Sequence, residues 1–140
     1  MQDSPIYAYL PAENLERARA FYEHTLGFVP TQQTNGGVVC AFGKQTAAFL
    51  YLYPTPNAGT SRASQAFWDV VDVDGEIEAS EARGVVFETY DGMPGERSAS
   101  GAVTAGGAKA AWFKDSEGDT LALIQNLSAP RADREPLNRL

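Results

Sequence analysis

The sequence predicts an α+β fold made of two βαβββ modules that together enclose a cleft. A strand, an amide or acidic helix cap, a helix, a glycine and a further strand occur twice, at a spacing of roughly 60 residues. Residues 54–63, PTPNAGTSRA, carry no hydrophobic period and separate the two copies as a linker. The chain of 140 residues suffices for one ordinary core, so we expect a single domain.

The first module, about residues 5–53, is organised around a helix at 14–28. Asn14 is a suitable helix cap, and Gly27 is suited to the left-handed turn that ends the helix. Four apolar side chains share one face at helical spacing, which predicts a buried stripe made of Leu15, Ala18, Tyr22 and Leu26.

Four strands are expected around this helix. The first covers 5–10 and is ended by Pro11, and the others cover 29–34, 37–42 and 47–53. Asn35-Gly36 predicts a tight hairpin turn, and residues 43–45 predict a second turn.

The second module, about residues 64–127, begins with a strand at 65–71. Asp72 or Asp74 caps the next helix, which Gly84 ends. A strand is expected at 85–90, and a hairpin at 110–114 and 120–125. The remaining strand falls in the glycine-rich segment 91–107, where the pattern does not place it. The tail 128–140 is predicted to be mobile.

Composition excludes several classes of function. A net charge of −7 opposes nucleic-acid binding, which needs clustered Lys and Arg, and it suits a cationic ligand. The sequence has neither an apolar run long enough for a membrane helix nor a signal peptide, so we expect a cytoplasmic protein without a membrane partner. Cys40, the single cysteine, is predicted to be a buried thiol. His24, the single histidine, is expected on the outer helix surface, which excludes a Ser-His-Asp triad.

Three segments, NLERARAFYEHTLGF, FWDVVDVDGEIEASEARGV and AWFKDSEGDTLALIQ, resemble signatures of the vicinal oxygen chelate superfamily. This superfamily holds glyoxalase I, extradiol dioxygenases, fosfomycin-modifying enzymes and bleomycin-resistance proteins. The resemblance spans residues 5–127. It implies paired βαβββ modules whose curved mixed sheets surround a cavity, commonly in a homodimer.

The resemblance also implies where the metal-dependent members place their four ligands. Those positions fall here on Tyr7, Leu50, Gln65 and Ala122, with Phe49 or Tyr51 as alternatives one position away from Leu50. Tyr, Leu, Gln and Ala do not make a divalent site, because such a site needs three or more carboxylate, imidazole or thiolate donors. We therefore expect neither a metal nor another cofactor.

The vacated positions and strand alternation predict an aromatic cavity for a small molecule instead. If Gln65 points inward, then Phe67 and Asp69 do so too. Asp69 and Tyr7 are the candidates for acid–base chemistry, while the alternative is that these side chains fill a closed core. The candidate ligand-binding residues are Tyr7, Tyr9, Leu50, Leu52, Gln65, Phe67, Asp69, Met93, Arg97, Trp112, Ala122 and Ile124.

Three functions stay open at this point. The first is a metal-free, homodimeric protein resembling the bleomycin-resistance branch, which binds a small cationic or planar aromatic molecule. The second is a glyoxalase-like lyase or isomerase that uses acid–base residues or a recruited metal. The third is a subunit whose cavity is filled by its own side chains and which serves interaction alone.

Overall fold

The computed structural model describes residues 1–34, 36–42 and 48–128. Of the predicted turn at Asn35-Gly36, only Gly36 is described. The predicted turn at 43–45 and nearly all of the tail lie outside the described residues. The chain divides into two compact units. Unit 1 consists of Met1–Ala66 and Lys114–Leu121, and unit 2 consists of Phe67–Phe113 and the chain from Ala122 onward. The turn joining the last two strands of the second module thus belongs to unit 1.

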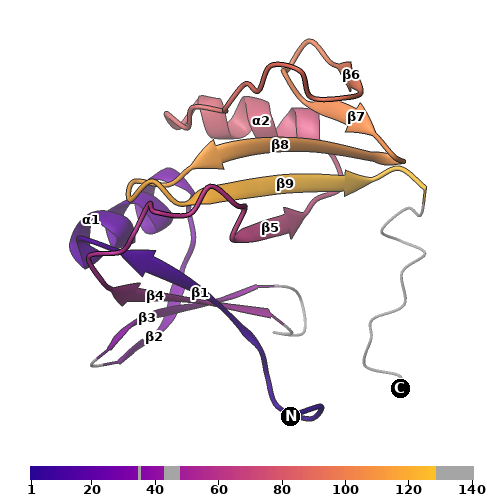
Figure 1. Ribbon diagram of the computed structural model, residues 1–140. Coiled ribbons are helices and arrows are strands. Elements are labelled where there is room, and N and C mark those ends of the chain that lie inside the picture. Colours follow the sequence, from indigo (N-terminus) through magenta and orange to yellow (C-terminus); the bar gives the residue numbers. More distant parts are fainter. Residues whose placement is uncertain (35, 43–47, 129–140) are drawn as a thin grey trace. The chain divides into compact units, whose positions relative to one another are not determined.

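Unit 1 contains the predicted order β-α-β-β-β. Its strands are β1 (Tyr7–Ala12), β2 (Pro30–Thr34), β3 (Gly37–Phe42) and β4 (Ala48–Pro54), and its helix α1 (Leu15–Ala20) continues into a π-helical turn η1 (Phe21–Thr25). The sheet order is β1-β4-β3-β2 (Figure 1). β1 runs parallel to β4, and the other neighbours are antiparallel.

The first helix begins and ends where the sequence predicts. The side chain of Asn14 accepts a hydrogen bond from Arg17 N at 3.0 Å, and Gly27 has φ +75°. Pro11 does not end the preceding strand, because β1 extends through it to Ala12. β1 is an edge strand, where a proline is tolerated because its missing N–H can face away from the ladder.

The core of unit 1 lies on one face of its sheet. Leu10, Leu50 and Leu52 are each at most 2% exposed, and Cys40, paired with Leu50, is 1% exposed, as predicted for a buried thiol. α1 contacts β4. The helix adds Ala18 and Tyr22 to this core at 0% and 1% exposure, whereas Leu15 and Leu26 of the predicted stripe are half-buried.

Unit 2 contains the helix α2 (Val73–Glu81) and the strands β5 (Ala66–Asp69), β6 (Glu96–Arg97), β7 (Val103–Ala105), β8 (Ala108–Lys114) and β9 (Thr120–Asn126). A few end residues of these strands, at 66, 114 and 120–121, belong to unit 1. The sheet order is β5-β9-β8-β7-β6. By order in the sheet, β5, β9, β8 and β7 correspond to β1, β4, β3 and β2. β7 is therefore the strand that the glycine-rich segment concealed.

The prediction of a strand at 85–90 is wrong, because the structure describes these residues and has no strand there. The segment makes one isolated bridge, Phe87 to Phe113, and one backbone bond from Glu88 N to Trp112 O at 2.7 Å. Val85 is buried, and the ring of Phe87 lies 5.5 Å from that of Phe113. The alternating apolar residues of this segment therefore indicate that side chains are buried, and they do not indicate a strand paired along its backbone.

Asp72, and not Asp74, caps α2. Its Oδ1 accepts from Gly75 N at 3.2 Å. Asp72→Ala is expected to lower the free energy of unfolding by about 1 kcal/mol, because it leaves an amide at the helix start without its partner. Asp72→Asn keeps an acceptor and should lose less than half of that. Urea unfolding of the three proteins checks this, and equal losses in both variants would contradict a capping role.

No helix among the described residues is long and apolar enough to cross a membrane.

Candidate functional site

One face of the unit 1 sheet carries five aromatic side chains. Strand register puts Tyr7 opposite Phe49 and Tyr9 opposite Tyr51, and Tyr53 follows two residues after Tyr51. Residues that oppose each other across a strand pair, and residues two apart along a strand, point to the same face. Tyr7, Tyr9, Phe49, Tyr51 and Tyr53 are called the aromatic face below.

The rings of the aromatic face contact one another. Tyr7 stacks on Phe49 with ring centroids 4.6 Å apart, and Tyr9 stacks on Tyr53 at 3.8 Å. Tyr9 also meets Tyr51 edge-on at 5.5 Å. These stacked and edge-on contacts are favourable for aromatic pairs, and they hold Phe49 against Tyr7, and Tyr51 and Tyr53 against Tyr9.

The aromatic face is open on its outer side. Tyr7 is 43% and Tyr9 62% exposed, and the other three rings are half-buried. The hydroxyl of Tyr51 is 2.5 Å from Thr34 Oγ1, which fixes the position of that ring. A contiguous exposed aromatic surface of this kind marks a binding surface more often than a random feature of a soluble protein.

Leu50 and Leu52 do not share this face, contrary to the sequence prediction. They alternate with Phe49, Tyr51 and Tyr53 and are 2% and 1% exposed in the core. The alternatives Phe49 and Tyr51, one position from Leu50, lie on the face that carries Tyr7 and Tyr9. The side chains of β4 that share a face with Tyr7 and Tyr9 are therefore one position away from those predicted.

The candidates of the second module that lie in unit 2 are placed as follows. Phe67 is 61% exposed, Asp69 and Met93 are half-buried, and Ala122 is 2% exposed. Arg97 is exposed, and its Nη2 donates to Tyr90 O at 3.1 Å. The half-buried Trp112 meets Tyr90 edge-on at 6.0 Å, and Ile124 is half-buried.

Gln65 belongs to unit 1 and has a distinctive side chain. Its Oε1 atom is buried and has no hydrogen-bond partner among the described residues. Its backbone N–H is fixed by Thr120 O at 2.9 Å. A buried acceptor without a partner is uncommon in folded proteins, so Gln65 is suited to receive a hydrogen bond from a bound molecule or a water.

The residues at the four metal positions do not fit a divalent cation. Leu50 and Ala122 are buried aliphatic side chains without donor atoms, which leaves a phenol and an amide. Within residues 1–34, 36–42 and 48–128, no group of three or more His, Cys, Asp or Glu side chains is placed to hold a metal ion.

The buried carboxylates lie outside the region that the sequence analysis favoured. Asp115, Glu117 and Asp119, in the turn between β8 and β9, are 7%, 9% and 0% exposed. Their signal in the sequence is the acidic turn DSEGD, which reads as a solvated loop when its distant partners are unknown. Tyr22, taken only as a core residue, donates to Asp115 Oδ2 at 2.6 Å.

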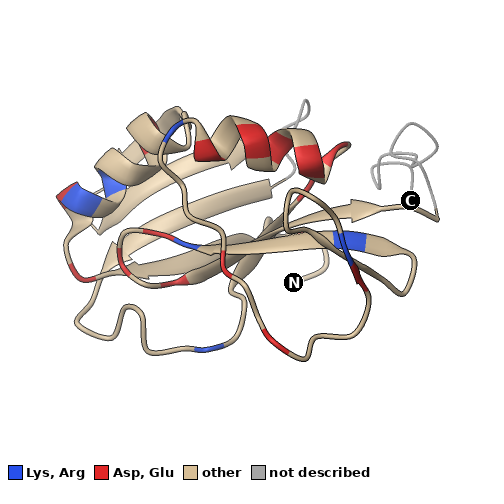
Figure 2. Cartoon of the chain, turned by 90° about the horizontal axis from the view of Figure 1, so that it is seen from above, with Lys and Arg blue, Asp and Glu red and all other residues tan. Residues whose placement is uncertain are grey.

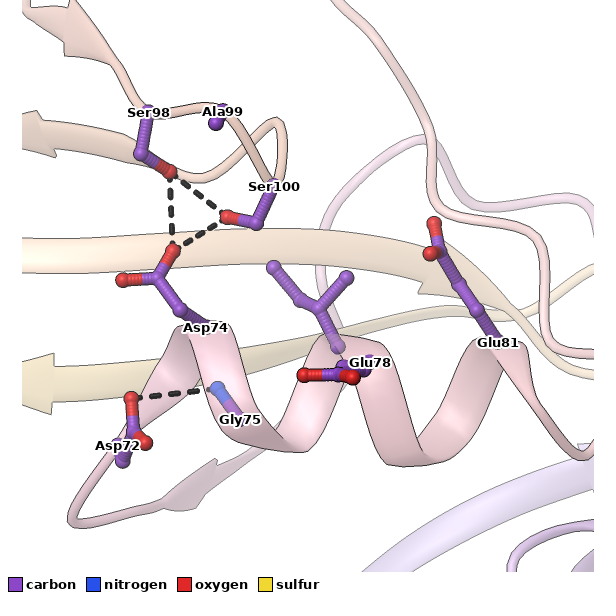
Figure 3. A pocket seen from close by; sticks show the side chains of 9 residues that line it. Asp72, Asp74, Gly75, Glu78, Glu81, Ser98, Ala99 and Ser100 are labelled. Carbon is purple, nitrogen blue, oxygen red and sulfur yellow. Dashed lines mark hydrogen bonds between the residues drawn. The ribbon is translucent and has the colours of Figure 1, made fainter.

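Unit 2 also has an acidic groove of about 680 Å³ beside α2. Figure 2 shows acidic residues along this helix. In Figure 3, Asp74 points toward Ser98 and Ser100, which donate to its Oδ1. Lys109 pairs with the same carboxylate, and this bond, followed by that from Ser100, lowers the pKa of Asp74 to about 2. The carboxylate of Asp74, which lines the groove, is therefore already paired with Lys109 and hydrogen-bonded within unit 2.

The strand order β1-β4-β3-β2 recurs as β5-β9-β8-β7, with β6 as one further strand, so the chain is an α+β protein built from two modules of the same topology. A family model described as "Glyoxalase/Bleomycin resistance protein/Dioxygenase superfamily" matches residues 6–136. The chain belongs to this superfamily.

Solved structures with the same fold include UcmS2, with 17% identity, a TM-score of 0.70, and coverage of 89% of this chain and 98% of that one. TnmS3, an antibiotic binding protein from Streptomyces sp. CB03234, is 22% identical with a TM-score of 0.61, covering 89% and 98%. Lactoylglutathione lyase from Agrobacterium tumefaciens is 17% identical with a TM-score of 0.60, covering 88% and 93%. Among curated proteins no match is found.

Proposed function

We propose that this chain is a metal-free, cytoplasmic member of the superfamily that binds a small planar aromatic molecule, preferably a cationic one, against the aromatic face. The observation that carries the proposal is the exposed pair Tyr7 and Tyr9, backed by Phe49, Tyr51 and Tyr53. Stacking on such rings recognises a flat ligand without catalytic groups. An antibiotic-binding protein shares the fold, which is consistent with this use.

Charge supports a cationic guest. The net charge of −7 gives the protein a potential that attracts cations. Tyrosine rings add a cation–π attraction when a positive group lies over their faces, worth about 0.5–2 kcal/mol. Gln65 Oε1, buried without a partner among the described residues, would accept a hydrogen bond from an N–H or O–H of the ligand.

The test is a thermal-unfolding and calorimetric screen of planar aromatic cations, including bleomycin, with and without chelator. We expect at least one compound to raise Tm irrespective of chelator, because a ligand present at 100 times its Kd stabilises the native state by about 2.7 kcal/mol. A shift caused by a divalent metal and abolished by chelator would overturn the metal-free proposal and favour a lyase or isomerase.

Tyr9→Ala is expected to weaken binding of a compound found in this screen about tenfold, because losing the most exposed ring of the aromatic face removes roughly 1.5 kcal/mol of stacking. Tyr9→Phe keeps the ring and should retain affinity within about twofold. Val29→Ala, at a residue that is 76% exposed outside the aromatic face, is the matched surface control. Calorimetric Kd values check this, and unchanged affinity in Tyr9→Ala would exclude the aromatic face as the site.

We propose that the protein is a homodimer, as the superfamily resemblance implies. Light scattering after size exclusion is expected to give twice the mass of the 15.1 kDa chain, and a monomer at micromolar concentration would contradict the proposal.

A further inference from the structure

Three carboxylates in the turn between β8 and β9 join three separate segments of unit 1. Asp115 Oδ2 accepts from Tyr22 OH at 2.6 Å, and Glu117 Oε1 accepts from Asn14 N at 2.7 Å, so both bind the first helix. Asp119 Oδ1 accepts from Gly59 N at 3.0 Å and so binds the linker. Asp115, Glu117 and Asp119 are called the carboxylate clasp below.

The linker lies tightly against this turn. A Cβ atom added at Gly59, whose φ is +73°, would come within 2.6 Å of Glu117 O. The linker continues to Gln65, whose N–H bonds to Thr120 O next to Asp119. Attachment of the linker to the turn therefore depends on contacts immediately around the Asp119 side chain.

Charge in the clasp is not balanced within these contacts. Arg17 donates through Nε and Nη2 to Glu117, at 2.8 and 3.1 Å. Asp115 accepts two backbone amides in addition to Tyr22, those of Glu117 and Asp119, each at 2.9 Å. Three donors therefore surround the two oxygens of Asp115.

Asp119 differs from its two neighbours. It is 0% exposed, and its Oδ2 has no hydrogen-bond partner among the described residues. Burial, together with the charges of Asp115 and Glu117, raises its pKa to about 6, although the Gly59 amide acts in the opposite direction. Tyr22, which also faces this group, stays neutral because burial and Asp115 raise its pKa well above the ordinary value.

We propose that Asp119 is a proton-operated latch, which in its protonated form donates from Oδ2 to Asp115, and in its ionised form repels Asp115 and loosens the turn. Ionisation places a second buried negative charge beside Asp115 without a new cation, so the charges repel. The proton is released to solvent. The latch does not depend on the proposed ligand-binding function.

The sign of the pH dependence follows from linkage. The native state holds a proton on Asp119 that the unfolded chain, with an ordinary pKa near 3.8, has lost above about pH 4. The stabilisation is complete below pH 3.8 and is lost as pH rises toward 6. Between pH 5 and pH 7 this group alone raises the unfolding equilibrium constant about tenfold.

The test compares urea unfolding at pH 5 and pH 7 in the full chain and in D119N. Asparagine can donate to Asp115 and accept from Gly59, so D119N should abolish about tenfold of the pH dependence. H24Q changes the single histidine of the chain, an exposed side chain, and should leave the dependence intact. An unchanged dependence in D119N, or its loss in H24Q, would overturn the proposal.

A measurement on the unmutated chain covers the case in which D119N does not fold. The ¹³C carboxyl resonance of Asp119 is expected to titrate with a midpoint near pH 6, and the hydrogen-exchange protection factor of the Asp119 amide, which donates to Asp115 Oδ1, should fall as that carboxyl ionises. A midpoint below pH 4.5, or a protection factor of the Asp119 amide that is constant from pH 5 to 7, would exclude the latch.

Discussion

Gly37→Ala is expected to destabilise the protein by at least about 3 kcal/mol, the largest effect we expect from a change of one methyl group. A Cβ atom at this position would lie 1.9 Å from Leu52 O and 2.7 Å from a ring carbon of Tyr51. Leu52 is paired with Val38 in the β3–β4 ladder, so its carbonyl cannot retreat without breaking that ladder. The same shift would displace Tyr51 and with it the aromatic face.

Alanine substitutions at two other glycines test whether the steric clash is the cause of the destabilisation. At Gly36 the nearest atom to an added Cβ is the Tyr51 hydroxyl oxygen at 3.1 Å, which is the tip of a side chain, so Gly36→Ala should cost less than about 1 kcal/mol. Gly84 has φ +95° and no atom within 4 Å, so Gly84→Ala measures backbone strain without a clash. Urea unfolding of the three variants checks this. If Gly37→Ala were no worse than Gly84→Ala, the clash would not be the cause.

The sequence predicts the fold well because local signals repeat. Asn14 and Gly27 bound the first helix, and Asp72 and Gly84 bound the second, each by a backbone requirement that acts within a few residues. The family-model match agrees with the fold inferred from these signals. The strand β7 was not placed because three residues are too few to show a period of two.

The candidate site is less predictable, because it depends on the register between strands. Tyr7 and Tyr9 were identified, but whether they face Leu50 or Tyr51 depends on an alignment of β1 with β4 that local sequence does not contain. A shift of one residue moves every side chain of a strand to the other face. The alternation of Phe49, Tyr51 and Tyr53 was the available signal, since it matches that of Tyr7 and Tyr9.

The carboxylate clasp could not be found from local pattern at all. The partners of Asp115 and Glu117 lie 93 and 100 positions away, at Tyr22 and Arg17. An acidic turn is ordinarily solvated, so the local sequence gives no reason to expect its residues to be buried. Burial became favourable only because amides, a hydroxyl and a guanidinium from the first helix satisfy the oxygens.

Glu117→Ala is expected to lower the free energy of unfolding by about 3 kcal/mol, because its carboxylate connects the turn to the first helix from a fully buried position. The Glu117 side chain is 0% exposed, and it accepts from Asn14 N, from Arg17 and from Ser116 Oγ. Removing it leaves the Asn14 amide without this acceptor and detaches the turn. The measurement is urea unfolding at pH 7.

The matched control is the ion pair between Arg19 and Glu23 on the same helical segment, at 3.1 Å. Both of its side chains are partly exposed, so Glu23→Ala should cost less than about 1 kcal/mol. A double-mutant cycle of Arg17 and Glu117 is expected to give a coupling energy of about 1–3 kcal/mol. Equal losses in Glu117→Ala and Glu23→Ala would show that burial of the pair does not matter.

The pH dependence of Glu117 has the opposite sign to that of Asp119. Burial alone would raise the pKa of Glu117, but the bonds from Arg17, Asn14 and Ser116 outweigh it and hold the pKa below the ordinary 4.5. Its contribution is therefore complete above pH 4.5 and is lost as pH falls below that value. Asp119 stabilises the fold when protonated and Glu117 when ionised, so the Asp119 contribution falls between about pH 3.8 and 6, whereas the Glu117 contribution is lost only below pH 4.5. Glu117→Ala should therefore remove the share of the acid sensitivity that Glu117 contributes, and it should shift the Asp119-dependent loss to lower pH, because the charge of Glu117 no longer raises the pKa of Asp119.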